Sequence, residues 1–283
     1  MLYIIVPVHN RVQVTEQFVE TLVVQTFTDY VLVLVDDGCT DKTVEMARTK
    51  LPARQLTVLT GSGQLWWAGA LQMAYQHLMR VMLPDDFVLI CNDDISFDSK
   101  FLASGLSLLN SRPDACIQAV GIDTESGTVD RGTVMDARRL HFRAALAGET
   151  PNCLSTRGLL MRGDTFARSG GFKPQRLPHY LSDYEFTVRL RKQGVRLVCD
   201  DRFRATIDLG LTGLNRYAIG NLSEFWSSAF SNRAKYNPKH WTAFVILVCE
   251  PALVPGHLLR IWAGFARALF AATRAGWRSR GNA

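Results

Sequence analysis

The strongest constraint on the fold is a regular alternation of short apolar runs and longer helix-compatible stretches over the first 120 residues. The short runs are apolar throughout, so both faces of each strand are expected to be buried, as in a parallel sheet. Alternation of strand and helix then predicts βαβ units with right-handed crossovers. The expected strands are Leu2–Val6, Val31–Val35, Gln55–Leu59, Asp86–Cys91 and Cys116–Gly121, and the expected helices are Thr15–Gln25, Asp41–Lys50, Leu65–Met82 and Asp98–Asn110.

The alternation is interrupted after this region. Residues 122–152 are rich in Gly, Thr, Asp and Arg, which predicts a hairpin or a mobile loop. A strand, two helices and another strand are expected next, and the chain from Asn221 onward reads as helical. These later elements are Cys153–Met161, Gly163–Ser169, Asp183–Gln193 and Val195–Cys199.

Composition excludes several classes of protein. Hydrophobic residues make up 47% and charged residues 20% of 283 residues, which is typical of a globular chain and not of a disordered one. The net charge is +6, and residues 241–283 contribute much of it, with five arginines against one glutamate. A basic tail on a nearly neutral body favours contact with an anionic surface and gives no reason to expect nucleic-acid binding.

Cysteine usage and the chain ends indicate a compartment. No two of the six cysteines have the C-x-x-C spacing, so a zinc site or redox pair is not expected, and we predict reduced cysteines in the cytosol. The sequence starts directly with a strand-like run, so no signal peptide is expected. No apolar stretch reaches the roughly 18 residues that span a bilayer.

Polar residues follow the expected strands, where ligands bind in sheets of this kind. Asp36 and Asp37 follow the second strand. They belong either to a turn that leads into a helix capped by Thr40 or Asp41, or to a site whose carboxylate accepts the imide N–H of a uracil or thymine ring. The sequence alone leaves both readings open.

The segment from Gly61 to Ala70 follows the third strand and excludes two nucleotide motifs. Trp66 stands where a dinucleotide fingerprint needs its third glycine, and no Gly-Lys-Ser/Thr of a P-loop is present. Trp66 and Trp67 are adjacent, so they point to different faces of a helix and are not both expected in the core. At least one is predicted to line a cleft, where aromatic rings stack on sugars.

Two further motifs carry acids. Asn92, Asp93 and Asp94 follow the fourth strand, and clustered oxygen ligands there suit a hard divalent cation that also binds substrate phosphates, or a ribose.

Ser182 and Glu185 have the spacing of a capping box, and Glu185 is also spaced for an ion pair with Arg189. Asp183 is needed for neither purpose. At the start of a helix it is expected to be ionised and suited to act as a general base.

Together these motifs resemble family 2 glycosyltransferases of the GT-A fold. The resemblance extends from Leu2 to about Gly213, and the tryptophan-containing segment is similar to a bacterial, rhamnosyltransferase-like subgroup that builds surface polysaccharides. It implies an α/β fold with a mostly parallel, Rossmann-like sheet flanked by helices. It also implies a catalytic domain over 1–220, with a nucleotide-sugar half (about 1–121) and an acceptor half (about 122–220). Residues 221–283 are expected to form a helical C-terminal extension.

The resemblance also implies roles for individual residues. Asp183 would be the catalytic base, and Asp94 would hold Mg²⁺ or Mn²⁺, with Asp208 as a second candidate ligand where many members have a histidine. Asp36 or Asp37 would recognise the nucleobase of the donor. The expected nucleotide-binding residues are Pro7, His9, Asn10, Arg11, Asp36, Asp37, Gly61 and Asp93. The expected sugar-binding residues, for donor or acceptor, are Trp66, Trp67, Gly69, Arg157, His179 and Glu185.

The implied reaction is a single inverting displacement from a UDP-, dTDP- or GDP-sugar to a hydroxyl of a glycan or a lipid-linked acceptor. The alternative is a catalytically silent module that binds nucleotide or sugar on the same fold. A nucleotidyltransferase is disfavoured because the segment after the first strand, His9 to Arg11, has no glycine. The oligomeric state is left open.

The C-terminal tail predicts a peripheral position on the inner face of the cell membrane. Apolar residues recur at near-helical spacing, and Arg260, Arg267 and Arg274 recur every seventh residue, which is typical of an interfacial amphipathic helix. The alternative is a helix that packs on the catalytic domain or on a second subunit, with its arginines in solvent. The apolar residues are Leu258, Leu259, Trp262, Phe265, Leu269 and Phe270.

Overall fold

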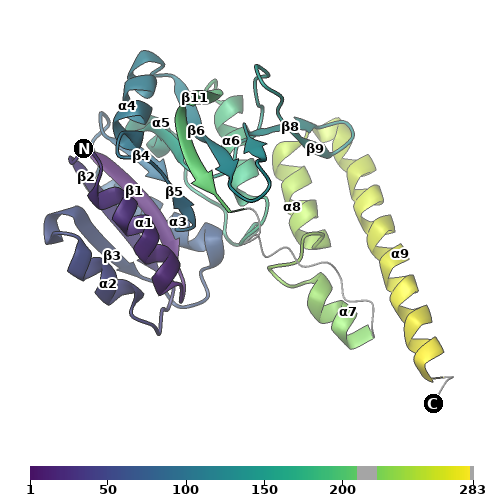
Figure 1. Cartoon of the computed structure of the whole chain (residues 1–283). Helices are drawn as coiled ribbons and strands as arrows, with labels where there is room; N and C mark the ends of the chain where they lie inside the picture. Colours follow the sequence, from purple (N-terminus) through teal and green to yellow (C-terminus); the bar gives the residue numbers. More distant parts are fainter. Residues whose placement is uncertain (209–221, 281–283) are drawn as a thin grey trace.

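A computed structural model of the chain describes residues 1–208 and 222–280, with side chains over 223–274 in the second range. Its centre is a nine-stranded sheet with helices on both faces, and three C-terminal helices lie beyond one end of it (Figure 1). The α/β fold expected from the sequence is therefore confirmed.

Parallel strands dominate the sheet. Its order is β3-β2-β1-β4-β10-β6-β11-β5, and β7 pairs with β6. The first four strands in this order are mutually parallel, β10 is antiparallel to both neighbours, and β11 is parallel to β6. The strands are β1 (Leu2–Val8), β2 (Tyr30–Asp36), β3 (Leu56–Thr60), β4 (Phe87–Ile90), β5 (Ile95–Ser96), β6 (Ala115–Asp123), β7 (Val129–Asp130), β10 (Leu159–Arg162) and β11 (Arg196–Ile207).

Two apolar layers cover the sheet because the central strands are apolar on both faces. Alternate residues of β1 point to opposite sides: Ile4 packs with α1, α2 and α4, whereas Ile5 packs with α3, α5 and α6. These helices are α1 (Val12–Val23), α2 (Thr43–Lys50), α3 (Trp66–Val81), α4 (Phe101–Ser111), α5 (Gly163–Arg168) and α6 (Ser182–Lys192).

The region between β6 and β10 contains the expected hairpin, formed by β8 (Thr133–Asp136) and antiparallel β9 (His141–Ala144). The strand expected over Cys153–Met161 is shorter in the structure, since β10 starts at Leu159. Strand β11 is longer than expected and runs past a register shift between Asp200 and Arg204.

The C-terminal helices are α7 (Leu222–Ala229), α8 (Pro238–Val248) and the long α9 (Val254–Arg280) (Figure 1). Helix α8 packs through Phe244 and Val248 on α6 and on the β8–β9 hairpin. Helix α9 contacts α7 through Phe265 and the hairpin through His257, whose Nε2 lies 2.8 Å from the carbonyl oxygen of Ala137. The expected domain boundary at residues 220 and 221 falls outside the described residues.

Some apolar side chains of α9 are packed against α7, and others are exposed to solvent. Phe265 is 8% exposed and packs on α7, whereas Leu259 and Phe270 are 75% and 63% exposed. No described helix is long and apolar enough to cross a membrane.

Candidate active site

A cavity of about 1000 Å³ lies at the carboxyl ends of several strands of the sheet. It is bounded by the segments after β1, β2, β3 and β4, by the start of α6 and by the segment between α7 and α8. Eleven of the residues predicted from the sequence line it together, although they are far apart in the chain. They are Pro7, His9, Arg11, Asp37, Trp66, Trp67, Asp93, Asp94, Arg157, His179 and Asp183.

Asp93 and Asp94, which follow β4, form ion pairs with Arg11, which follows β1. Arg11 places Nη1 2.9 Å from Oδ1 of Asp93 and Nη2 3.4 Å from Oδ2 of Asp94. The hydroxyl of Thr15 donates to Oδ2 of Asp93 at 2.9 Å. Burial raises the pKa of Asp93 to about 6, although Arg11 and Thr15 lower it. Asp94 is more accessible, at 16% exposure, and is therefore the better placed of the two acids to meet a ligand.

Oxygen donors at this point fit a hard divalent cation. Oδ1 of Asn92 is buried without a hydrogen-bond partner, and Asn92 and Asp94 both line the cavity. An amide oxygen beside a carboxylate is a donor set that Mg²⁺ or Mn²⁺ accepts while keeping waters or phosphate oxygens. In the described part of the chain, no three His, Cys, Asp or Glu side chains gather closely enough to hold an ion by themselves. Asp208 is not among the described residues of the cavity lining, and its metal role stays a prediction.

The Asp36–Asp37 pair has a structural role that the sequence did not reveal. Oδ1 of Asp37 accepts the backbone N–H groups of Gly63 and Leu65 at 2.8 and 3.1 Å, and Oδ2 accepts those of Leu65 and Trp66 at 2.9 and 3.1 Å. Asp37 thereby fixes the start of α3. Oδ1 of Asp36 accepts the backbone N–H of Cys39 at 2.7 Å, and Asp36 does not line the cavity. Contact of either acid with a base stays a prediction.

Three predicted ligand-binding residues do not line the cavity. Oδ1 of Asn10 accepts the backbone N–H groups of Thr40 and Asp41 at 2.7 and 3.2 Å, which joins two loops. A Cβ on Gly61 would lie 2.9 Å from Oδ1 of Asp37, so a glycine is required there for close packing. Gly69 is buried within α3. Direct contact of these residues with a ligand stays a prediction.

The paired tryptophans both line the cavity. The ring of Trp66 lies 5.8 Å from that of His179, and Nε1 of Trp67 donates to the hydroxyl of Thr156 at 3.2 Å. Burial, and to a smaller extent the positive charge of Arg233, lower the pKa of His179 to about 4. His179 is therefore neutral near pH 7 and forms part of an aromatic wall.

Asp183 is the second residue of α6 and lines the cavity. Burial raises its pKa to about 6, against the lowering effects of the Tyr184 backbone N–H and of Arg157. The helix start was expected to keep this carboxylate ionised, and with a pKa of about 6 it is mostly ionised at pH 7, although its pKa is raised and not lowered. Desolvation destabilises the charged form of Asp183 by more than the helix N-terminus stabilises it.

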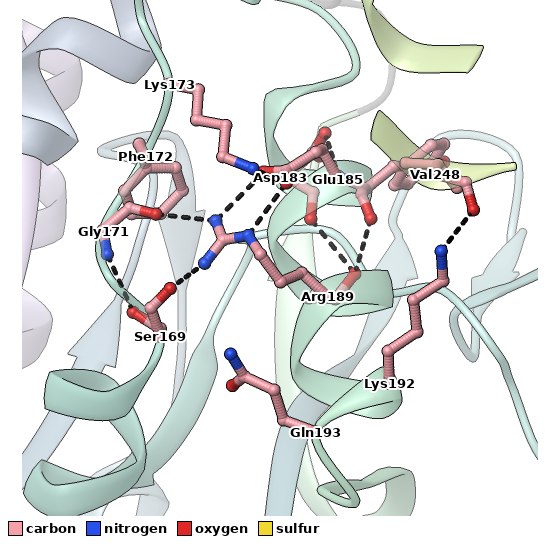
Figure 2. A network of polar contacts seen from close by, with 12 residues as sticks. Ser169, Gly171, Phe172, Lys173, Asp183, Glu185, Arg189, Lys192, Gln193 and Val248 are labelled. Atoms are coloured by element: carbon pink, nitrogen blue, oxygen red, sulfur yellow. Dashed lines mark hydrogen bonds and ion pairs between the residues drawn. The ribbon is translucent and has the colours of Figure 1, made fainter. Parts of the chain in front are cut away.

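Glu185 does not line the cavity, and its predicted contact with a sugar stays a prediction. Its carboxylate is 2% exposed and lies 2.8 Å from Nζ of Lys173 and 2.8 Å from Nε of Arg189 (Figure 2). Arg189 in turn donates to the carbonyl oxygens of Ser169 and Gly171. The expected Glu185–Arg189 pair is confirmed.

The expected capping box is absent. The side chain of Ser182 donates instead to the carbonyl oxygen of His179 at 2.7 Å, and Leu181, at φ 68°, precedes α6 without capping it through its side chain.

Sequence reasoning missed two groups of cavity residues. The β7–β9 region contributes Asp130, Thr133 and Phe142, and the C-terminal extension contributes Arg233, Lys235 and Trp241. None of them follows a strand of the alternating pattern or belongs to a motif. An isolated Arg-x-Lys between two helices was the only available signal, and it does not reveal what the segment contacts.

Comparison with known proteins agrees with this architecture. The family model described as glycosyl transferase family 2 matches residues 3–167, which is more than half of the chain. A mannosyltransferase from Pyrobaculum calidifontis, solved with GDP-Man and Mn²⁺, superposes with a TM-score of 0.60 at 16% identity, over 97% of this chain and 73% of that one.

Two further solved structures share the fold. Residues 1–349 of S. aureus TarS superpose with a TM-score of 0.60 at 16% identity, over 100% of this chain and 92% of that one. GalNAc-T7, solved with UDP, GalNAc and Mn²⁺, gives a TM-score of 0.60 at 12% identity, over 74% of this chain and 43% of that one. No curated protein sequence matches significantly. The family model and the shared GT-A architecture lead to one conclusion: the chain belongs to glycosyl transferase family 2.

Proposed function

We propose that this protein is an inverting glycosyltransferase that moves a hexosyl or deoxyhexosyl group from a nucleoside-diphosphate sugar to a hydroxyl of a glycan or lipid-linked acceptor. One observation carries the proposal. Asp183, a carboxylate whose pKa is raised to about 6, lines the same cavity as Asp94, which fits a cation and a diphosphate. A base on one side and a leaving-group site on the other are what a single displacement requires.

In the proposed reaction, Asp183 removes the proton of the acceptor hydroxyl. The acceptor oxygen forms a bond to the anomeric carbon as the bond from that carbon to the phosphate oxygen breaks. The nucleoside diphosphate leaves with the bonding electron pair, and the configuration at the anomeric carbon inverts. A base with a pKa near 6 is deprotonated at neutral pH yet still accepts a proton readily, which suits this step.

Asp94 and Asn92 are the residues proposed to hold Mg²⁺ or Mn²⁺. The bound cation would neutralise charge that develops on the diphosphate. Arg11 contributes in the same region by limiting repulsion between Asp93 and Asp94. Two solved structures of the same fold contain Mn²⁺, which supports this assignment.

Turnover tests this function. Purified protein is incubated with UDP-, GDP- and dTDP-sugars and Mn²⁺, and release of nucleoside diphosphate is followed. The variant Asp183→Asn should retain its fold and donor binding but lose roughly a hundredfold or more of its turnover. Near-normal turnover of the variant would remove the base assignment. Donor binding by wild type without any turnover would favour the silent binding module.

A role in bacterial surface-polysaccharide synthesis is proposed from the tryptophan-containing segment, Gly61 to Ala70. The outer face of α9 supports the same role. It exposes Leu259 and Phe270 beside Arg260, Arg267 and Arg274, which complements an anionic lipid surface. Docking there would place the enzyme on the inner face of the cell membrane, near a lipid-linked acceptor.

Vesicle co-sedimentation tests the membrane proposal. Wild type should pellet with anionic vesicles at low salt, and Leu259→Ser with Phe270→Ser should abolish pelleting. Leu146→Ser is the matched control, because Leu146 is equally exposed, at 69%, but lies in the loop after the hairpin. Equal pelleting of the double variant and the control would exclude α9 as the docking surface.

A further inference from the structure

Two cations from the C-terminal extension reach the cavity of the catalytic domain. Arg233 and Lys235 lie between α7 and α8, and both line the cavity beside residues of the first half of the chain. We propose that Arg233 and Lys235 bind the diphosphate group of the sugar donor, so that the C-terminal extension completes the donor site. This inference rests on the proposed glycosyltransferase function and assigns a donor-binding role to a segment that no motif marked.

The segment that carries these cations is fixed from both sides. Nε1 of Trp241 donates to the carbonyl oxygen of Lys235 at 2.9 Å. Asn237 is 1% exposed, and its side chain donates to the carbonyl oxygen of Ser231 at 3.2 Å and accepts the backbone N–H of Lys239 at 3.0 Å. Ala234, between the two cations, is buried. The backbone is therefore held in place while the charged ends remain accessible.

Arg233 lies beside the start of α3. Its guanidinium carbon is 5.8 Å from the centre of the Trp66 ring, and the backbone N–H of Trp66 is bonded to Asp37 after β2. The charge that acts most strongly on Asp183, the proposed base, is instead that of Arg157. The extension brings the guanidinium of Arg233 to the start of α3, which Asp37 holds at the carboxyl end of β2.

The charges of the cavity leave these two cations available. Arg11 is already shared between Asp93 and Asp94. Within residues 1–208 and 223–274, neither Arg233 nor Lys235 forms an ion pair with a carboxylate; their side-chain contacts are with the aromatic rings of Trp66 and Tyr236. A diphosphate would supply the missing negative charge, and the fork of a guanidinium matches phosphate oxygens in two hydrogen bonds.

Calorimetric titration of the full chain tests the proposal. Wild type is titrated with UDP, GDP and dTDP in the presence of Mn²⁺, and then with the nucleoside of the diphosphate that binds best. The double variant Arg233→Gln, Lys235→Gln should bind that diphosphate at least tenfold more weakly and the nucleoside unchanged. Arg267→Gln is the control, because Arg267 is an exposed arginine on α9 away from the cavity.

The outcomes separate this inference from the function on which it rests. A double variant that binds the diphosphate as well as Arg267→Gln does would overturn the proposal and leave the glycosyltransferase function intact. Equal losses for diphosphate and nucleoside would also overturn it, because the defect would then not concern the phosphates. Wild type that binds none of the three diphosphates would refute the proposed function itself. Thermal melts verify that both variants are folded.

Discussion

Substitution of Glu185 by glutamine separates a structural role from a catalytic one. Glu185 is 2% exposed and interacts with Lys173 and Arg189, each at 2.8 Å. Glutamine has nearly the same volume, so Glu185→Gln removes the charge without a cavity and leaves Arg189 without its ionic partner. Breaking a buried ion pair in this way costs about 3–5 kcal/mol.

The loss should be visible in a thermal melt. For a domain somewhat smaller than this chain, 1 kcal/mol corresponds to about 2–4 °C, so the midpoint should fall on the order of 10 °C. At a temperature where the variant is folded, turnover and donor affinity should stay within about threefold of wild type, because Glu185 does not line the cavity. Glu149→Gln is the control. It breaks the Arg143–Glu149 pair, which is exposed, and should leave the melt unchanged.

The pH dependence of stability provides a second test of the ion pairs that Glu185 forms with Lys173 and Arg189. Burial raises the pKa of Glu185, but hydrogen bonds from Arg189 and Lys173 lower it more, and the net pKa lies below the usual value. The stabilisation is therefore present above the unfolded pKa of about 4.3 and is lost as pH falls through the lower folded value. An unchanged melting temperature for Glu185→Gln, or a selective loss of sugar binding in the folded variant, would refute this account.

Three further predictions concern the cavity. Because burial raises the pKa of Asp183 to about 6, log kcat should fall by about one unit per pH unit below pH 6, and a flat profile down to pH 5 in folded protein would contradict its role as base. Asp94→Ala should abolish the enhancement of nucleoside-diphosphate binding by Mn²⁺ in calorimetry, and an equal enhancement in wild type and variant would show that the ligand lies elsewhere. Asp37→Ala removes the acceptor for three backbone N–H groups at the start of α3, so the free energy of unfolding in urea should fall by about 1–3 kcal/mol, whereas Asp36→Ala should cost less.

Local sequence determined most of the fold of the first half of the chain. The apolar runs at β1, β2, β3, β4 and β6 lie within about two residues of their expected places, because an apolar stretch of strand length between turn residues specifies a buried strand on its own. Acids that follow such strands are brought to one edge of the sheet by the parallel topology. The sequence could therefore indicate that Asp37, Asp93 and Asp94 lie near a common site.

Tertiary packing decided what each of these polar residues does. Asp37 and the start of α3 are 26 or more residues apart, and only the fold makes the carboxylate a helix cap. Burial of Glu185 against Lys173, and of Asp183 in the cavity, depends on layers contributed by distant segments. Arg233 and Lys235 reach the cavity only because α8 packs on α6 and on the β8–β9 hairpin. Helix and strand formation depend mainly on residues close in sequence, so the elements could be predicted from the sequence. Desolvation and ion pairing depend on the complete set of neighbours in space, so the roles of the side chains could not.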